Sequence, residues 1–326
     1  VYKRQVIKSC NKQEIDDIKN NLKKHFRKTR DLGKLKWFLG MLISEDKDAL
    51  YLGQPLYIQK LLERFNFTHL NPIGTPLEMK TGEANKEEME DADLKLYREA
   101  IGGLLYLSNN TRPDITVAVN RAARSMSNPK KQNWTSIKRI FKYLQGTKQI
   151  GLKFPKDKSF KIIGYSDANW GGEEDNRRST SGIMVFIAGC LVSWKAVQQK
   201  SVAVSTMEAE YMALFVAVQW IDWVIKLLKE MKLEIDLPIT IYEDNEACIS
   251  LCKNPVKHSR ANNIDLKYHF TRERVLWGIV NPVSLSSELQ LADMLTKAIS
   301  KERLQKLCSL SNIIIIKSSL RGSVEN

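Results

Sequence analysis

The sequence predicts an α/β fold, with a mixed sheet flanked by helices in the C-terminal half of the chain. After residue 158, runs typical of strands alternate with amphipathic runs typical of helices, in the order three strands, helix, strand, two helices, strand, helix. The first of these helices is long, about 206–229, and its apolar residues recur mostly at three- and four-residue steps. Hydrophobic residues make up 43% of the 326 residues, which suits a packed core in about two domains.

The first half of the chain is expected to be mostly helical around one hairpin. Its expected elements are a helix at about 13–26, a strand run at 35–43 with a glycine inside it, a short strand at 49–52, and helices at about 57–65, 94–108, 115–126 and 134–145. Asp114 is a candidate N-cap of the helix at 115–126. The acid-rich stretch 79–93 is the expected linker.

The second half contributes the sheet. Its expected elements are strands at 160–165, 182–188 and 191–194, the helix at 206–229, a strand at 238–243, helices at 245–252 and 265–277, a strand at 279–284 and a last helix at 288–298. A short strand-like run follows at 313–316.

The charge balance indicates a polyanionic partner. Lys and Arg total 51 against 37 acidic residues, a formal net charge of +14, and nucleic acid is the commonest partner of so basic a chain. The five cysteines show no zinc-site spacing and are expected to be free thiols. No apolar run of about 18 residues and no signal-peptide pattern is seen, so we expect an intracellular protein without a membrane partner.

Four acidic residues lie at the edges of expected elements. Asp167 ends the first strand, Glu208 is in the first turn of the long helix, Asp244 closes the fourth strand, and Asp293 is in the last helix. Carboxylates that converge at one sheet edge repel unless divalent cations lie between them, and oxygen ligands suit Mg²⁺. Each acid alone is as easily a turn or helix cap. Glu210 competes with Glu208, and spacing does not choose between them.

The acids belong to a series of short motifs, which are Tyr165-Ser166-Asp167-Ala168-Asn169-Trp170, Arg177-Arg178-Ser179-Thr180-Ser181-Gly182, Ser193-Trp194-Lys195, Glu208-Ala209-Glu210-Tyr211, Asp244-Asn245 and Asp293-Met294-Leu295-Thr296-Lys297. In their order and spacing, these motifs resemble the ribonuclease H domain of Copia-type retrotransposon Pol polyproteins. Upstream, Asp31-Leu32-Gly33-Lys34-Leu35-Lys36-Trp37-Phe38-Leu39-Gly40 and Asn71-Pro72-Ile73-Gly74-Thr75-Pro76 are similar to the end of the reverse transcriptase in the same polyproteins. The resemblance covers about residues 11–305.

The resemblance implies a ribonuclease H-like mixed five-stranded sheet and an enzyme that hydrolyses the RNA strand of RNA–DNA hybrids. It implies two Mg²⁺ ions, which Mn²⁺ can replace, held by Asp167, Glu208, Asp244 and Asp293, and so favours Glu208 over Glu210. Arg177, Arg178, Asn245 and Lys297 are candidates for substrate contact. The hybrid and the rest of a Pol polyprotein are the expected partners, in the cytoplasm, in a virus-like particle, or in the nucleus.

The resemblance also divides the chain. Residues 1–80 correspond to a C-terminal remnant of the reverse transcriptase, 81–157 to a helical thumb or connection segment, 158–305 to the ribonuclease H domain, and 306–326 to a C-terminal tail. We expect 158–305 to fold on its own and 1–150 not to, since an isolated hairpin is marginal in water.

Two departures from the family favour an alternative, a catalytically inactive remnant that only binds nucleic acid. The paired aspartates of the polymerase are absent before the first helix, so no polymerase activity is expected, and Asn263 stands where relatives usually carry a histidine. The integrase, a related fold, would use three acids rather than four, and the motif at Asp293 argues against it.

Overall fold

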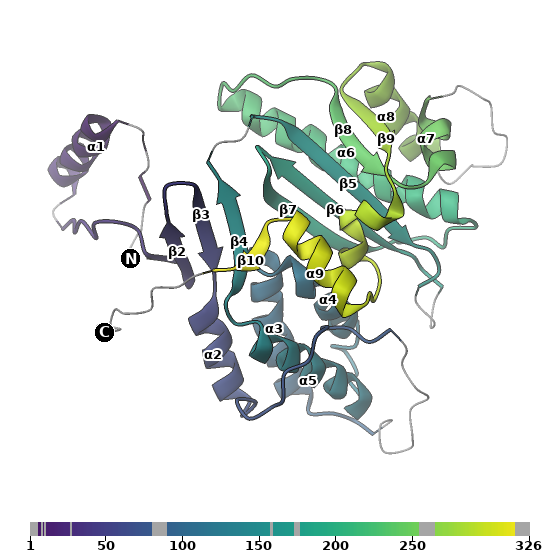
Figure 1. The fold of residues 1–326 in the computed structure, drawn as a ribbon, viewed down its shortest axis with the longest axis horizontal. Helices are drawn as coiled ribbons and strands as arrows, with labels where there is room; N and C mark the ends of the chain where they lie inside the picture. The colour runs from purple at the N-terminus through teal and green to yellow at the C-terminus, as the bar shows by residue number, and fades with distance from the viewer. Residues whose placement is uncertain are drawn as a thin grey trace.

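The structure, a computed structural model, describes residues 6–7, 9, 11–26, 28–79, 90–156, 159–172, 177–253 and 265–316. Within these ranges the chain forms two five-stranded sheets, one built mainly from its first half and one from its second (Figure 1). The expected histidine position, Asn263, and most of the expected linker lie outside the described residues.

The first sheet is antiparallel and has the strand order β1-β2-β3-β4-β10. Its strands are β1 (Trp37–Phe38), β2 (Met41–Glu45), β3 (Ala49–Gly53), β4 (Ile150–Pro155) and β10 (Ile313–Ile315). The expected single strand at 35–43 is wrong, because Leu39 and Gly40 both have positive φ and turn the chain back on itself. Strand β4 was not predicted.

The helices of the first half are α1 (Lys12–His25), α2 (Pro55–Arg64), α3 (Leu94–Asn110), the 3₁₀ turn η1 (Pro113–Ile115), α4 (Thr116–Arg124) and α5 (Lys131–Gly146). Asp93 caps α3 by accepting a hydrogen bond from the Leu96 amide at 2.9 Å.

The expected cap at Asp114 is wrong. Asp114 is instead fully buried against the Arg112 guanidinium, and its carboxylate also accepts a hydrogen bond from the Tyr143 hydroxyl at 2.7 Å.

The second sheet is mixed, which confirms the expected fold class. Its order is β7-β6-β5-β8-β9, from β5 (Ile162–Asn169), β6 (Thr180–Ile187), β7 (Cys190–Gln198), β8 (Ile239–Glu243) and β9 (Val280–Ser284). The hairpins β5-β6 and β6-β7 are antiparallel, whereas β8 and β9 extend the sheet in parallel beside β5. This arrangement brings the carboxyl ends of β5 and β8 to the same edge.

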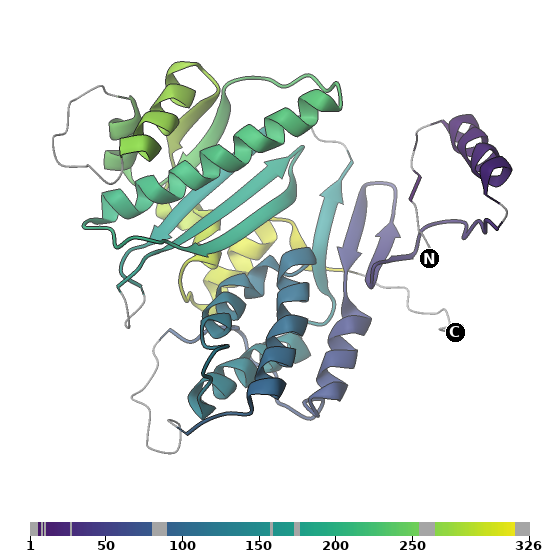
Figure 2. The same cartoon turned by 180° about the vertical axis from the view of Figure 1, so that it is seen from behind.

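Helices cover both faces of the mixed sheet. Helix α6 (Thr206–Glu230) lies along one face, with α7 (Glu246–Lys253) and α8 (Asp265–Leu276) beside it (Figure 2). By length and composition α6 could cross a membrane, but its apolar side chains form the core against the sheet. Along β6, Ile183 and Val185 join this core while Met184 and Phe186 join the core on the opposite face, as the two-residue period of a strand requires.

The expected last helix at 288–298 is wrong. The segment forms two 3₁₀ turns, η2 (Ser287–Leu289) and η3 (Leu291–Leu295), and the α-helix α9 (Lys301–Leu310) follows them. The tight turns let the backbone lie directly on the sheet at Gly182, where an added Cβ would stand 2.8 Å from the Ala292 carbonyl oxygen. Glycine at this position therefore permits the close contact that a regular helix would not make.

One core spans both halves of the chain. It contains side chains of α2 to α5 from the first half together with Met184, Phe186, Met294 and Leu307 from the second. The last strand β10, which lies in the expected tail 306–326, pairs with β4. The two halves are thus joined by a sheet and by a shared apolar core.

Candidate active site

Asp167 and Asp244 stand side by side at the edge of the mixed sheet. Strands β5 and β8 are parallel neighbours in which Tyr165 is paired with Tyr242. Each aspartate comes two residues after its tyrosine, so the two lie at the same level of the sheet. Asp167 is buried and Asp244 is half-buried. The sequence-based expectation that these acids meet at one edge agrees with their position.

The structure brings Glu210, and not Glu208, to these two aspartates. One carboxylate oxygen from each of Asp167, Glu210 and Asp244 lies within 4.8 Å of the others. Glu208 instead takes part in capping the N-terminus of α6. Its carboxylate accepts a hydrogen bond from the Val204 amide at 2.8 Å, and its own amide donates to Ser205 Oγ at 3.1 Å. This corrects the choice of Glu208 that the family resemblance favoured. The pattern Ser-x-x-Glu at 205–208 is a capping-box signal that could have identified the structural role.

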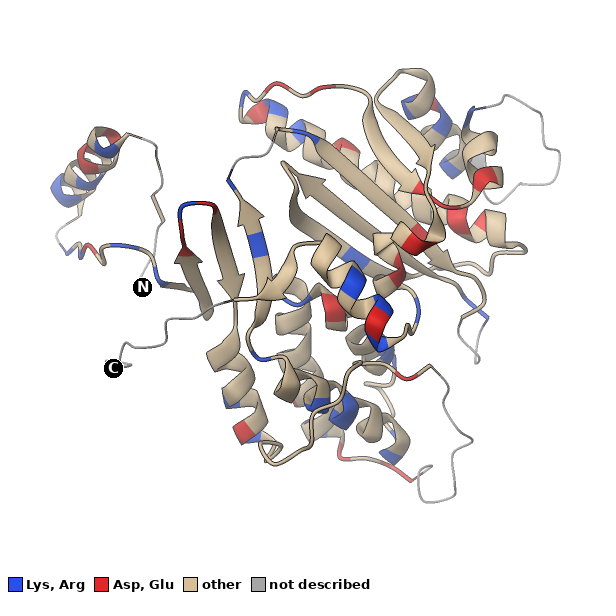
Figure 3. Cartoon of the chain, in the orientation of Figure 1, with Lys and Arg blue, Asp and Glu red and all other residues tan. Residues whose placement is uncertain are grey.

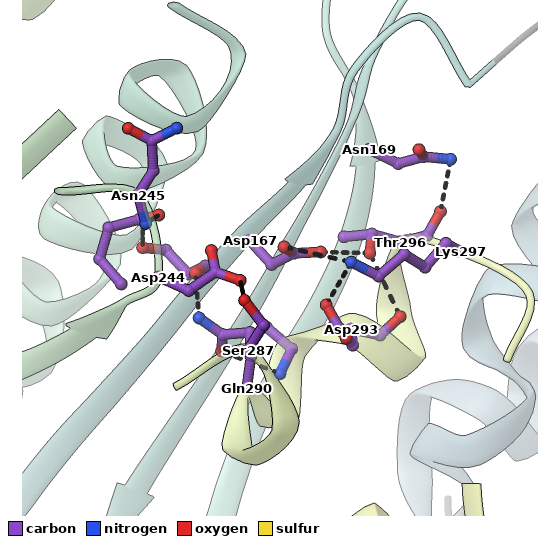
Figure 4. Close-up of polar contacts among 12 residues, drawn as sticks. Asp167, Asn169, Asp244, Asn245, Ser287, Gln290, Asp293, Thr296 and Lys297 are labelled. Atoms are coloured by element: carbon purple, nitrogen blue, oxygen red, sulfur yellow. Dashed lines mark hydrogen bonds and ion pairs between the residues drawn. The ribbon is translucent and has the colours of Figure 1, made fainter. Parts of the chain in front are cut away.

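Asp293 belongs to η3, which packs on the face of the mixed sheet opposite to the face that α6 covers. It is fully buried, and it forms ion pairs with Lys297, at 2.6 Å, and with Arg303. The Lys297 ammonium also lies 3.8 Å from a carboxylate oxygen of Asp167, so it stands between two of the acids (Figure 4). Figure 3 shows the acidic and basic residues of η3 and α9 gathered beside the end of the mixed sheet.

Hydrogen bonds fix η2 and η3 against the sheet edge. The Gln290 side chain donates to the Ser166 carbonyl oxygen at 2.9 Å, and the Thr296 hydroxyl donates to the Asp167 carboxylate. The Ser287 hydroxyl donates to Asp244 at 2.7 Å (Figure 4). These contacts set the position of the segment that carries Asp293.

The clustered acids hold protons more tightly than isolated carboxyl groups do. Burial raises the pKa of Asp167 to about 7, and repulsion from Asp293 and Asp244 acts in the same direction against the opposing effect of Lys297 and Thr296. Burial and then repulsion from neighbouring acids raise the pKa of Glu210 to about 11. Binding of a divalent cation at this site would therefore displace protons from these carboxyl groups.

Sequence reasoning missed Glu243, a further buried acid beside the cluster. Its carboxylate accepts hydrogen bonds from the Ser166 hydroxyl at 2.7 Å and from the Asn245 amide at 3.2 Å, and burial raises its pKa well above the usual range. The alternation of Ile239, Ile241 and Glu243 along β8 could have indicated that this side chain points into the core.

The other expected contact residues lie in different settings. Arg177 and Arg178 are exposed just before β6, whose first residue Thr180 pairs with Asn169 at the site end of β5. Asn245 caps α7, because its side-chain oxygen accepts a hydrogen bond from the Cys248 amide at 2.9 Å. Lys297 contacts two of the acids directly, Asp167 and Asp293.

The site meets the chemical requirements of a hard divalent cation. Its donors are carboxylate oxygens, which Mg²⁺ and Mn²⁺ prefer. Glu210 Oε2 is buried with no hydrogen-bond partner among the described residues, and it lies in the cluster with Asp167 and Asp244. A buried oxygen without a donor is costly, and a cation would satisfy it.

The fold and this cluster together define an α/β protein with a mixed five-stranded sheet and a carboxylate site at the sheet edge. A family model described as reverse transcriptase (RNA-dependent DNA polymerase) matches residues 2–79. The retrovirus-related Pol polyprotein from transposon RE2 of Arabidopsis thaliana is 35% identical over 288 residues, which are 88% of this chain and 20% of that protein. The corresponding polyprotein from transposon TNT 1-94 of Nicotiana tabacum is 36% identical over 302 residues, 90% of this chain and 22% of that protein.

The chain is homologous over most of its length to Pol polyproteins of Copia-type retrotransposons and spans about a fifth of the length of these relatives. Among solved structures, one match is the crystal structure of LC11-RNase H1 in complex with RNA/DNA hybrid. The matched region covers 98% of that chain and 45% of this one, with 18% sequence identity and a TM-score of 0.33.

Proposed function

We propose that this chain is a metal-dependent ribonuclease H, which hydrolyses the RNA strand of RNA–DNA hybrids as part of a Pol polyprotein. The observation that carries the proposal is the convergence of Asp167, Glu210 and Asp244 within 4.8 Å at the edge of the mixed sheet. The similarity to the Pol polyproteins and the net charge of +14 support a nucleic-acid substrate.

The residues divide into those that would hold the cations and those that would meet the substrate. Asp167, Glu210, Asp244 and Asp293 are the proposed ligands of two Mg²⁺ or Mn²⁺ ions, which when bound supply activation of the attacking water and stabilisation of the leaving oxygen. The exposed arginines at 177 and 178 flank the same edge of the sheet. Guanidinium groups bind phosphate oxygens in a bidentate manner, so these two side chains are the proposed contacts to the hybrid backbone.

A cleavage assay with defined substrates tests the proposal. With Mg²⁺, the protein should degrade a labelled RNA–DNA hybrid to products with 5′-phosphate and 3′-hydroxyl ends, spare single-stranded RNA, and stop when EDTA is added. A folded sample that cleaves no hybrid with either Mg²⁺ or Mn²⁺ would contradict it.

The alternative of an inactive nucleic-acid-binding remnant gives a different result with one substitution. In an enzyme, Asp244→Asn should abolish cleavage while hybrid binding persists. In a pure binding protein, the substitution should change neither cleavage, which is already absent, nor affinity beyond the effect of one charge.

A further inference from the structure

Arg303, on the first turn of α9, connects two of the proposed ligands that come from different parts of the chain. Its guanidinium nitrogen Nη2 forms an ion pair with Asp293 and donates a hydrogen bond to the Ser287 carbonyl oxygen at 2.6 Å. Ser287 in turn donates from its hydroxyl to Asp244 at 2.7 Å. One side chain thus holds Asp293 directly and reaches Asp244 through Ser287.

The helix that carries Arg303 is itself firmly placed. Ser300 caps it by accepting a hydrogen bond from the Arg303 amide at 3.2 Å, and Leu304, Leu307 and Cys308 are buried in the core that both halves share. The Arg303 backbone therefore has little freedom, and its side chain, about a third exposed, extends from a fixed point to the sheet edge. Rigid support of this kind is what holds a ligand in a binding orientation.

Arg303 and Lys297 contact Asp293 on different oxygens and in different surroundings. The Lys297 ammonium pairs with Oδ1 of Asp293 and also lies 3.8 Å from a carboxylate oxygen of Asp167. Lys297 is therefore on the side of Asp293 that faces Asp167. Arg303 pairs with Oδ2 and is bonded to the backbone of η2, away from Asp167. If Asp293 holds a cation, the Lys297 contact to Oδ1 would be the one to yield, whereas the Arg303 contact to Oδ2 could remain.

We propose that Arg303 is a positioning residue of the metal site, which holds Asp293 directly and Asp244 through Ser287 in the orientation that binds a divalent cation. The proposal rests on the function proposed above. Residues that support metal ligands in this way typically change metal affinity by about 10–100-fold when they are removed. The effect should therefore be on metal affinity more than on turnover at saturating metal.

Direct Mn²⁺ binding to the full chain, measured by electron paramagnetic resonance, tests this without relying on cleavage. Arg303→Met should weaken Mn²⁺ binding by about 10-fold or more and raise the Mn²⁺ concentration for half-maximal cleavage equally, while kcat at saturating Mn²⁺ changes by less than about 3-fold. Arg303→Lys, which keeps a cation for Asp293, should recover part of the affinity. Lys306→Met is the matched control, because Lys306 lies on the same helix and pairs at 3.6 Å with the exposed Glu288 instead.

A double-mutant cycle separates positioning from a general structural effect. In an Asp293→Asn background, Arg303→Met should have a smaller effect on Mn²⁺ affinity than in the wild type, since the direct contact is already altered and only the path through Ser287 to Asp244 remains. If the wild type binds Mn²⁺ and cleaves hybrid but Arg303→Met binds Mn²⁺ equally well, this inference is wrong and the proposed function stands. If Arg303→Met does not fold, Arg303→Gln, which removes the charge but keeps a polar side chain, takes its place, and an Arg303→Gln protein with wild-type Mn²⁺ affinity overturns the inference. A wild type that neither binds Mn²⁺ nor cleaves overturns both proposals.

Discussion

The ammonium group of Lys297 lies 2.6 Å from a carboxylate oxygen of the fully buried Asp293. The same ammonium lies 3.8 Å from Asp167, which is 1% exposed. Lys297 therefore supplies positive charge between two acids that would otherwise repel each other, at the place where the proposed function requires a divalent cation.

Replacing this lysine should destabilise the protein only when metal is absent. In EDTA, Lys297→Met should lower the free energy of unfolding by about 1–2 kcal/mol, less than for a fully buried pair because the lysine is partly exposed. Saturating Mg²⁺ should remove most of the difference, since the cation replaces the lost charge and stabilises the folded state by binding it. Urea unfolding with and without Mg²⁺ measures both values. An equal loss under the two conditions would contradict the idea that lysine and metal substitute for each other.

Glu210 should reduce the stability of the metal-free protein as the pH rises. Its pKa is raised from 4.5 to about 11 in the folded state. The contribution of the protonated Glu210 to the free energy of unfolding is therefore fully present below pH 4.5 and is lost progressively as the pH rises toward 11. Glu210→Gln cannot ionise. In EDTA it should therefore match the wild type near pH 4 and exceed it at pH 8 by more than about 1.4 kcal/mol, the equivalent of one pKa unit. Chemical unfolding at several pH values checks this, and a difference that does not grow with pH would count against the burial of this acid.

The buried pair of Arg112 and Asp114 should matter far more than an exposed pair in the same region. Both side chains are fully buried, and Arg112 also donates hydrogen bonds to Thr147, at 3.0 Å to its carbonyl oxygen. Asp114→Ala leaves an uncompensated buried guanidinium and should cost about 3–5 kcal/mol. Asp91→Ala, which removes the exposed partner of Lys130, should cost less than about 1 kcal/mol. Thermal unfolding of the two variants gives the comparison, and similar losses would contradict the account.

Strand β10 should be required for the stability of the whole chain. Ile313 is buried where β10 pairs with β4, whereas Ile315 on the same strand is 70% exposed. Ile313→Asp should lower the free energy of unfolding by more than about 3 kcal/mol, and Ile315→Asp by less than about 1 kcal/mol.

The shared core leads to a related expectation about the two halves. Unfolding followed by tryptophan fluorescence and by loss of cleavage should coincide in one transition, because the core includes side chains from both halves. A fragment of residues 158–305 lacks Leu307 and Ile313 and should not unfold cooperatively by itself. A sharp transition from that fragment would instead support the independent domain expected from the sequence.

Much of the mixed sheet could be predicted because its strands and helices follow one another with clear periodicity. Asp167 and Asp244 could be singled out because each lies near the end of a strand, whereas Asp293, in the middle of η3, was singled out by its motif and not by an element edge. The choice between Glu208 and Glu210 could not be made from spacing, since it depends on how α6 is rotated on the sheet. That rotation is set by packing, in which Ala209 and Ala213 contact Ala168 and Ala203.

The parts that were not predicted depend on contacts between distant segments. Strand β4 is formed by pairing with β3 and β10, which lie far from it in the sequence. The tight turns of η3 depend on the absence of a side chain at Gly182, on a different strand. Arg303 gave no local signal, because its partners Asp293 and Ser287 meet it only in the folded chain.

Glu210 should complete the metal-binding site that cleaves hybrid, and a matched pair of substitutions on one helix tests this role most directly. Glu210→Gln and Glu208→Gln remove the same charge two residues apart, and Mg²⁺-dependent cleavage of a labelled RNA–DNA hybrid is measured for both. We predict that Glu210→Gln lowers kcat by at least about 100-fold, because it removes a ligand of the ions that stabilise the reacting oxygens, whereas Glu208→Gln stays within about 3-fold of the wild type. Loss of cleavage in Glu208→Gln with cleavage retained in Glu210→Gln would contradict the site described above.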